Sequence, residues 1–151
     1  MKKQLLKGGV MLVSIVALAF LTALVSNAQS RSRQAGGNVP FDFVVGEKTL
    51  AAGSYSVGTI SITSADAVLV RSRDGRQKAI RLTNSVSDSA NTRRARLVFH
   101  RYGNTYYLTQ VWAAGANQGR ELSKSKMERA EMELAKNSSG PEVVTIVAEL
   151  E

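Results

Sequence analysis

The stretch NVPFDFVVGEKTLAAGSYSV, from Asn38 to Val57, decides the fold. Hydrophobic residues alternate along its first half, which is typical of a β-strand with one buried face. A glycine follows at position 46, and the second half reads Leu50-x-x-Gly53-x-Tyr55. This spacing predicts a tyrosine corner, in which the tyrosine hydroxyl bonds to upstream backbone and holds a crossover between two sheets. We therefore interpret the stretch as a folding device and not as a binding site.

Short β-type runs separated by turn signals continue along the chain and predict an all-β domain. The predicted strands cover residues 39–45, 54–62, 68–72, 78–83, 95–102, 105–112 and 143–150. Asp74-Gly75 predicts a type I′ hairpin turn and Gly103-Asn104 a type II′ turn. Residues 84–94 predict a polar loop that crosses between sheets, and residues 113–122 predict a second loop.

One helix is predicted near the C-terminal end. Ser125-Lys126-Met127-Glu128 fits a capping box before a helix that extends to about Lys136, with Met127, Ala130 and Leu134 on one apolar stripe. The fold class is therefore mainly β: a small antiparallel β-sandwich or partly closed barrel with one C-terminal amphipathic helix and a final strand. A lipocalin-like barrel is the alternative and would imply an interior ligand. The chain is short for that barrel, and its N-terminal strand lacks the Gly-x-Trp expected there.

The longer pattern Pro40-Phe41-x-Phe43-x-Val45-Gly46, followed by Leu50-x-Ala52-Gly53-x-Tyr55, resembles a group of small secreted bacterial proteins of uncharacterised function. In that group proline often stands where this chain has Ala51. The resemblance extends over the domain that follows the leader and supports its fold and location. It implies no catalytic residue.

The first 28 residues have the pattern of a secretory signal peptide. Three lysines precede an uncharged apolar run from Val10 to Val25, and small residues end the segment at Ala28. The run is shorter than the roughly twenty residues that a spanning helix needs. We expect cleavage after Ala28, with an uncleaved anchor as the alternative, then a flexible leader over residues 29–38 and a single β-rich domain over residues 39–151. No spanning segment is expected after cleavage.

Composition narrows the location further. The chain contains no cysteine, which excludes a cysteine-linked lipid and disulfides, and this favours a bacterial periplasm or the extracellular space over a small eukaryotic secreted domain. The formal net charge is +8, and removal of the three lysines of the signal segment leaves +5. The secreted protein is therefore basic.

Catalytic and metal-binding patterns are missing from the sequence. His100 is the only histidine, no Gly-x-Ser-x-Gly elbow is present, and no glycine-rich phosphate loop occurs. One histidine without cysteines does not make a zinc site. Asp42, Glu47 and Asp66 could belong to a carboxylate pair, although each fits a turn or an outward strand position. We expect no enzyme activity, no cofactor and no metal.

Two classes of function are left, and the first is a secreted non-catalytic domain that acts through protein or envelope contacts. In the 95–112 hairpin, Phe99 is expected opposite Leu108, Leu97 opposite Gln110 and Ala95 opposite Trp112, on a face that packs inward. The opposite face then forms an exposed contact patch of His100, Tyr102 and Tyr107. The predicted core contains Phe41, Phe43, Tyr55, Leu97, Phe99, Leu108 and Trp112.

The second class is binding of an anionic polymer or of lipid head groups; a nucleic acid is not expected as the partner. The hairpin VLVRSRDGRQKAIRL places Leu69 opposite Ile80 and Arg71 opposite Lys78, so one face is expected to lead from the core to a basic turn. Like charges opposite each other destabilise a sheet unless something offsets them. The candidate anion-binding residues are Arg71, Arg73, Arg76 and Lys78, together with Arg93, Arg94 and Arg96.

Overall fold

The computed structural model describes residues 35–60, 67–88, 94–136 and 140–148. Their elements are β1 (Ala35–Val39), β2 (Phe43–Val45), β3 (Lys48–Leu50), β4 (Gly53–Thr59), β5 (Ala67–Ser72), β6 (Lys78–Ser87), β7 (Ala95–Tyr102), β8 (Thr105–Trp112), β9 (Gln118–Leu122), α2 (Lys126–Ala135) and β10 (Glu142–Ala148). The predicted signal peptide lies outside the described residues. Within the described residues, no helix has the length and apolar character to cross a membrane.

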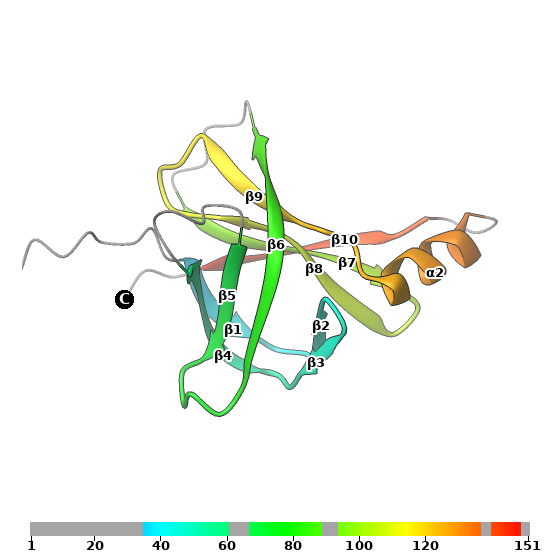
Figure 1. The fold of residues 1–151 in the computed structure, drawn as a ribbon, viewed down its shortest axis with the longest axis horizontal. Helices are drawn as coiled ribbons and strands as arrows, with labels where there is room; N and C mark the ends of the chain where they lie inside the picture. Colours follow the sequence, from blue (N-terminus) through cyan, green and yellow to red (C-terminus); the bar gives the residue numbers. More distant parts are fainter. Residues whose placement is uncertain (1–34, 61–66, 89–93, 137–139, 149–151) are drawn as a thin grey trace, which may run out of the picture. The chain divides into compact units, whose positions relative to one another are not determined.

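The strands form one mixed sheet in two layers, which confirms the mainly β class (Figure 1). One layer has the order β1-β4-β5-β6, and the other contains β9, β8, β7 and β10 with β2 and β3 at the β8 edge. β6 belongs to both layers, because its residues 78–82 pair with β5 and its residues 83–87 pair with β9. No ladder joins β1 to β10 among the described residues, so the sheet is not closed into a barrel.

Two loop predictions are wrong for the same reason. β6 continues through residues 84–87 of the predicted 84–94 loop and itself makes the crossing between layers. Residues 118–122, predicted as part of a loop, form β9 between β6 and β8. Both segments are polar and have weak β-propensity, and their strand conformation comes from pairing with two neighbours.

Regular structure begins earlier than the leader prediction allows. β1 starts at Ala35, which is buried and pairs with Val57. A Cβ atom on Gly36 would lie 2.9 Å from the carbonyl oxygen of Tyr55. The glycine therefore permits close approach of two strands, and residues 35–38 do not belong to a flexible leader. The run after Val39 is interrupted at Pro40, and the chain then enters the other layer as β2.

The core lies between the two layers and contains most of the predicted residues. Phe43, Tyr55, Leu97, Phe99, Leu108 and Trp112 are buried. Phe41 is only partly buried; its ring stacks on that of Tyr106, with 3.8 Å between the centroids, and meets Phe99 edge-on. The burial of these apolar side chains stabilises the domain.

The tyrosine corner has the predicted hydrogen bond. The Tyr55 hydroxyl donates to the carbonyl oxygen of Ala51 at 2.6 Å. The backbone N–H of Ala51 donates at 2.9 Å to the side-chain oxygen of Gln77, at the end of the β5–β6 turn. The corner is therefore tied both to its own upstream backbone and to the neighbouring hairpin, which fixes where that hairpin turns.

The β7–β8 hairpin has the predicted turn but a different register. Gly103 has φ +58° and Asn104 has a negative φ, as a type II′ turn requires. Phe99 lies opposite Leu108 as predicted, but a bulge follows, so that Leu97 pairs with Val111 and Arg96 with Trp112. The predicted pairs Leu97–Gln110 and Ala95–Trp112 are therefore wrong.

The extra residue at this bulge is Thr109. Its hydroxyl, buried in the domain, donates to the carbonyl oxygen of Val98 at 3.0 Å. The side chain thus supplies a hydrogen bond at the place where the ladder is interrupted.

Candidate functional site

Four of the predicted anion-binding residues come together at the β5–β6 turn. Arg71 of β5 lies directly opposite Lys78 of β6, and Arg73 and Arg76 lie in the turn between them. These four residues, all exposed, are called the basic tip. Neither Arg71 nor Lys78 forms an ion pair with any residue that the structure describes. Figure 1 shows the turn at the end of the hairpin, beyond the last paired residues.

The prediction of a type I′ turn at Asp74-Gly75 is wrong. Type I′ needs positive φ at both central residues, and only Gly75 has it, at +73°. The N–H of Gly75 donates to the carbonyl oxygen of Ser72 at 2.9 Å, so that Arg73 and Asp74 are the central residues. Asp74 imposes this shape by accepting hydrogen bonds from the Ser72 hydroxyl at 2.5 Å and the Arg76 N–H at 3.0 Å. The same two bonds lower the pKa of Asp74.

The prediction that the face of the basic tip leads into the core is wrong. Leu69 pairs with Ile80 on the same face as Arg71 and Lys78, in the predicted register. However, Ile80 is 60% exposed, and Leu82, further along this face, is 66% exposed. The valines of β5 on the opposite face fill the core instead. The outer face of the hairpin therefore combines exposed aliphatic side chains with the basic tip.

The other predicted arginines do not join the tip. Arg93 lies outside the described residues, and Arg94 is exposed just before β7, in the other layer. Arg96 is paired with Asp88, and its guanidinium lies 4.5 Å from the ring centroid of Trp112. Arg96 is therefore a packing residue and is not available to an anion.

The predicted aromatic contact patch is not a surface. Tyr102 and Tyr107 are buried with Val44 in a second apolar cluster, against which Met132 and Ala135 of α2 pack. His100, on the same face, keeps only 24% of its side chain exposed. The prediction is wrong because α2 covers this face of the hairpin, so that both faces are buried.

Helix α2 begins as predicted but turns a different side to the sheet. The Ser125 hydroxyl oxygen accepts the backbone N–H of Glu128 at 3.0 Å, which confirms the cap. Met127 and Leu134 of the predicted apolar stripe are exposed, whereas Glu128 is buried. Glu47, in the β2–β3 turn, accepts the backbone N–H of Lys126 at 3.1 Å and so holds the start of the helix in place.

Burial of Glu128 creates a polar cluster that the sequence does not reveal. One carboxyl oxygen, Oε1, lies 4.0 Å from Nδ1 of His100, and neither atom has a hydrogen-bond partner within the described part of the chain. Burial raises the pKa of Glu128, partly opposed by Lys124 and the backbone N–H of Ser125. Burial also lowers the pKa of His100, as does Lys124. The one hint in the sequence is the capping box, which places Glu128 beside the helix cap.

Two of the three predicted carboxylate candidates have structural partners. Asp42 accepts the backbone N–H of Ala52 at 2.8 Å, and Glu47 binds the helix start, while Asp66 lies outside these regions. Across the same regions, no three histidine, cysteine or acidic residues gather closely enough to hold a metal ion. No protein-family model, curated protein or solved structure matches this chain.

Proposed function

We propose that this chain is an exported, non-catalytic domain that attaches to anionic lipid surfaces through the outer face of its β5–β6 hairpin. The observation that carries the proposal is the combination, on one exposed face, of the basic tip with Ile80 and Leu82. A surface of cations beside aliphatic side chains matches the boundary between anionic head groups and acyl chains.

The charge arrangement supports this proposal. Arg71 and Lys78 are directly opposed in the ladder, where like charges destabilise a sheet. Asp74, which lies 3.7 Å from the Arg76 guanidinium, has its carboxylate engaged within the turn. Phosphate or carboxylate groups bound between Arg71 and Lys78 would remove the repulsion, and arginine forks can contact such groups through two hydrogen bonds.

The aliphatic residues distinguish a lipid surface from a soluble polyanion. Leu69, Ile80 and Leu82 continue the face that carries the basic tip. On this face β4 contributes only small residues, Gly58 opposite Leu69 and Ser56 opposite Arg71. Apolar side chains that project without cover gain free energy when they enter the interfacial region of a bilayer. A soluble polyanion would use only the basic tip.

Vesicle sedimentation tests the proposal. The protein should bind vesicles with anionic phosphatidylglycerol and not vesicles of phosphatidylcholine, and binding should fall as salt rises. Changing Arg71, Arg73, Arg76 and Lys78 to glutamine should weaken binding about a hundredfold or more, since each basic residue contributes about 1 kcal/mol near such a surface. The control carries the same charge change elsewhere, at Arg94, Lys126, Arg129 and Lys136, and should lose much less.

A second variant separates lipid from polymer. Ile80→Ser with Leu82→Ser should weaken vesicle binding about tenfold and leave salt-sensitive retention on a heparin column unchanged. Equal binding of the basic-tip variant and its control to vesicles would refute the lipid proposal. Loss of heparin retention in the basic-tip variant, with no vesicle binding by the parent, would favour the anionic polymer.

Export is the second part of the proposal. It rests on the lysines, the apolar run and the small residues before Gln29. Mass spectrometry of the protein recovered outside the cytoplasm should give a chain that begins at Gln29. Recovery of residues 1–28 still attached, in a membrane fraction, would contradict cleavage.

A further inference from the structure

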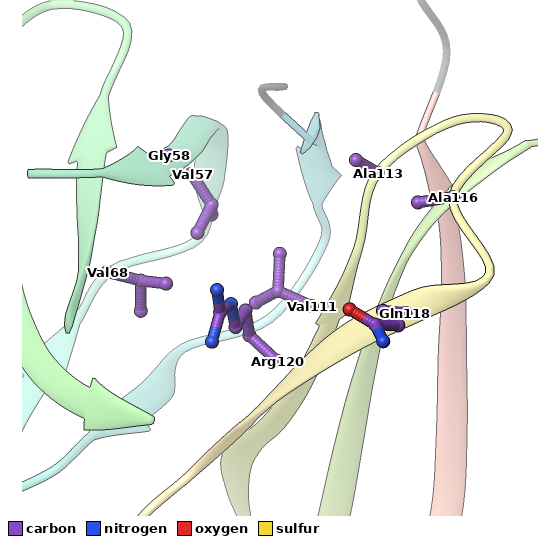
Figure 2. A pocket seen from close by; sticks show the side chains of 8 residues that line it. All are labelled: Val57, Gly58, Val68, Val111, Ala113, Ala116, Gln118 and Arg120. Carbon is purple, nitrogen blue, oxygen red and sulfur yellow. The ribbon is translucent and has the colours of Figure 1, made fainter. Parts of the chain in front are cut away.

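A cavity of ≈ 170 Å³ lies between the two layers, on the opposite side of β5 from the basic tip (Figure 2). Val57 of β4 and Val68 of β5 form one wall, and Val111 of β8 and Ala116 of the following loop belong to the other. An engineered apolar cavity of about 150 Å³ accepts a benzene molecule. The cavity therefore has room for a small organic group.

Arg120 of β9 is the charged residue among the described residues that line this cavity. It lies opposite Val111 in the β8–β9 ladder, on the same side of β9 as the core residue Leu122. Figure 2 shows its side chain extending across the space toward Val57 and Val68. The guanidinium thus projects between the layers among aliphatic side chains.

Arg120 differs from the other half-buried arginines in the described residues. Arg81 donates to the carbonyl oxygen of Ser123 at 2.8 Å, Arg96 is paired with Asp88, and Arg101 donates to Glu142 at 3.1 Å. The side chain of Arg120 forms no hydrogen bond or ion pair with any described residue.

A guanidinium keeps its charge at all physiological pH values, and withdrawing it from water without a partner is unfavourable. The side chain of Arg120 is half-buried, so a carboxylate that enters the cavity can pair with a guanidinium that is only partly hydrated.

We propose that this cavity binds a small amphiphilic monocarboxylate. The carboxylate pairs with the guanidinium of Arg120 through two parallel hydrogen bonds, and the apolar part lies against Val57, Val68 and Val111. The cavity volume limits the apolar part to about the size of a benzene ring or a six-carbon chain. The site is independent of the proposed lipid attachment, because it uses the inner face of β5 and the basic tip uses the outer face.

Hexanoate is the probe, with hexan-1-ol as its uncharged counterpart. In calorimetric titration of the full-length protein, hexanoate should bind once per chain and more tightly than hexan-1-ol. In NMR spectra it should shift the methyl signals of Val57, Val68 and Val111. It should also raise the melting temperature as its concentration rises, since it binds only the folded state.

Three variants test the assignment. Arg120→Gln should weaken hexanoate binding about tenfold or more, as expected for loss of hydrogen bonds to a charged group, and leave hexan-1-ol binding unchanged. Ala116→Leu fills the cavity from a loop and should weaken binding of both ligands. Arg76→Gln, in the basic tip, should change neither.

The melting temperature of the ligand-free Arg120→Gln variant gives a further readout. Because Arg120 has no partner in the described residues, the variant should be at least as stable as the parent. Unchanged hexanoate affinity in Arg120→Gln, or no hexanoate binding by the parent, would overturn the proposal. If Arg120→Gln does not fold, unchanged hexanoate affinity in Ala116→Leu would overturn it equally.

Discussion

Replacing Glu128 by glutamine should stabilise the domain at neutral pH and leave its stability nearly unchanged in acid. Glu128 is 4% exposed, and its Oε1 atom lacks a hydrogen-bond partner within the described part of the chain. Glutamine has the same size and removes the charge. Its amide oxygen can still accept the Ser125 N–H, as in a capping box, and its amide N–H can donate to Nδ1 of His100.

The magnitude follows from the unmet hydrogen bonds. Leaving a buried polar group without a partner costs about 1–3 kcal/mol. For a domain of this size, each kcal/mol changes the melting temperature by about 4 °C, so the variant should melt about 4–12 °C higher at pH 7.

The sign of the pH dependence follows from the raised pKa of Glu128. A group whose pKa is raised by folding favours the folded state below its ordinary value of 4.5, and this contribution is lost as pH rises through the raised pKa. The stability difference between parent and variant should therefore be small below about pH 4.5 and largest at neutral pH. The lowered pKa of His100 costs stability in both proteins as pH falls below 6.5. In the variant, protonation of Nδ1 also removes the hydrogen bond from the glutamine amide, which further reduces the stability difference in acid.

Circular dichroism melting curves between pH 4 and pH 8 measure the effect. The control is Glu133→Gln, because Glu133 is exposed on the same helix and pairs with Lys136 at 2.6 Å. An exposed pair of this kind contributes about 0.3–0.5 kcal/mol, so the control should shift the melting temperature little. The reasoning is refuted if Glu128→Gln lowers stability at pH 7, or if its effect is the same at pH 4.

Four further substitutions test the packing. Gly119→Ala should cost about 1–3 kcal/mol, because the new Cβ would lie 2.5 Å from the ring of Trp112; an unchanged urea midpoint would contradict this. Tyr55→Phe removes the 2.6 Å hydrogen bond to Ala51 and should lower the free energy of unfolding in urea by about 1 kcal/mol. An unchanged free energy of unfolding would show that this hydrogen bond does not stabilise the domain. Phe99→Ala should lower the free energy of unfolding by about 3–5 kcal/mol, because Phe99 is fully buried. Tyr107→Ala should also destabilise the domain, because α2 buries the Tyr107 side chain. Equal melting temperatures of the parent and Tyr107→Ala would contradict the position of the helix.

Local sequence determined the elements whose cause is local. The alternation before Gly46 predicts β-structure, and the spacing from Leu50 to Tyr55 predicts the corner, because a tyrosine can reach its own upstream backbone without help from the rest of the fold. The Gly103-Asn104 turn and the Ser125 cap are also correct, since each depends on a few neighbouring residues.

Only the tertiary structure decided which faces are covered. A period of two divides the β7–β8 hairpin into two faces, but it does not reveal that α2 covers the face of Tyr107. Helix periodicity likewise favours the side of Met127, whereas packing against the sheet buries Glu128 instead. Burial of a face depends on residues distant in sequence, and no local pattern contains that information.

The two candidate sites also differ in how far the sequence predicts them. The residues of the basic tip cluster because Arg71 pairs with Lys78. The short turn makes this pairing predictable from the sequence, although the sequence does not predict the turn type. The cavity depends on β9, a polar segment that becomes a strand only because β6 and β8 pair with it. The inward direction of Arg120 results from that pairing, so long-range hydrogen bonding, and not local propensity, places a charge between the layers.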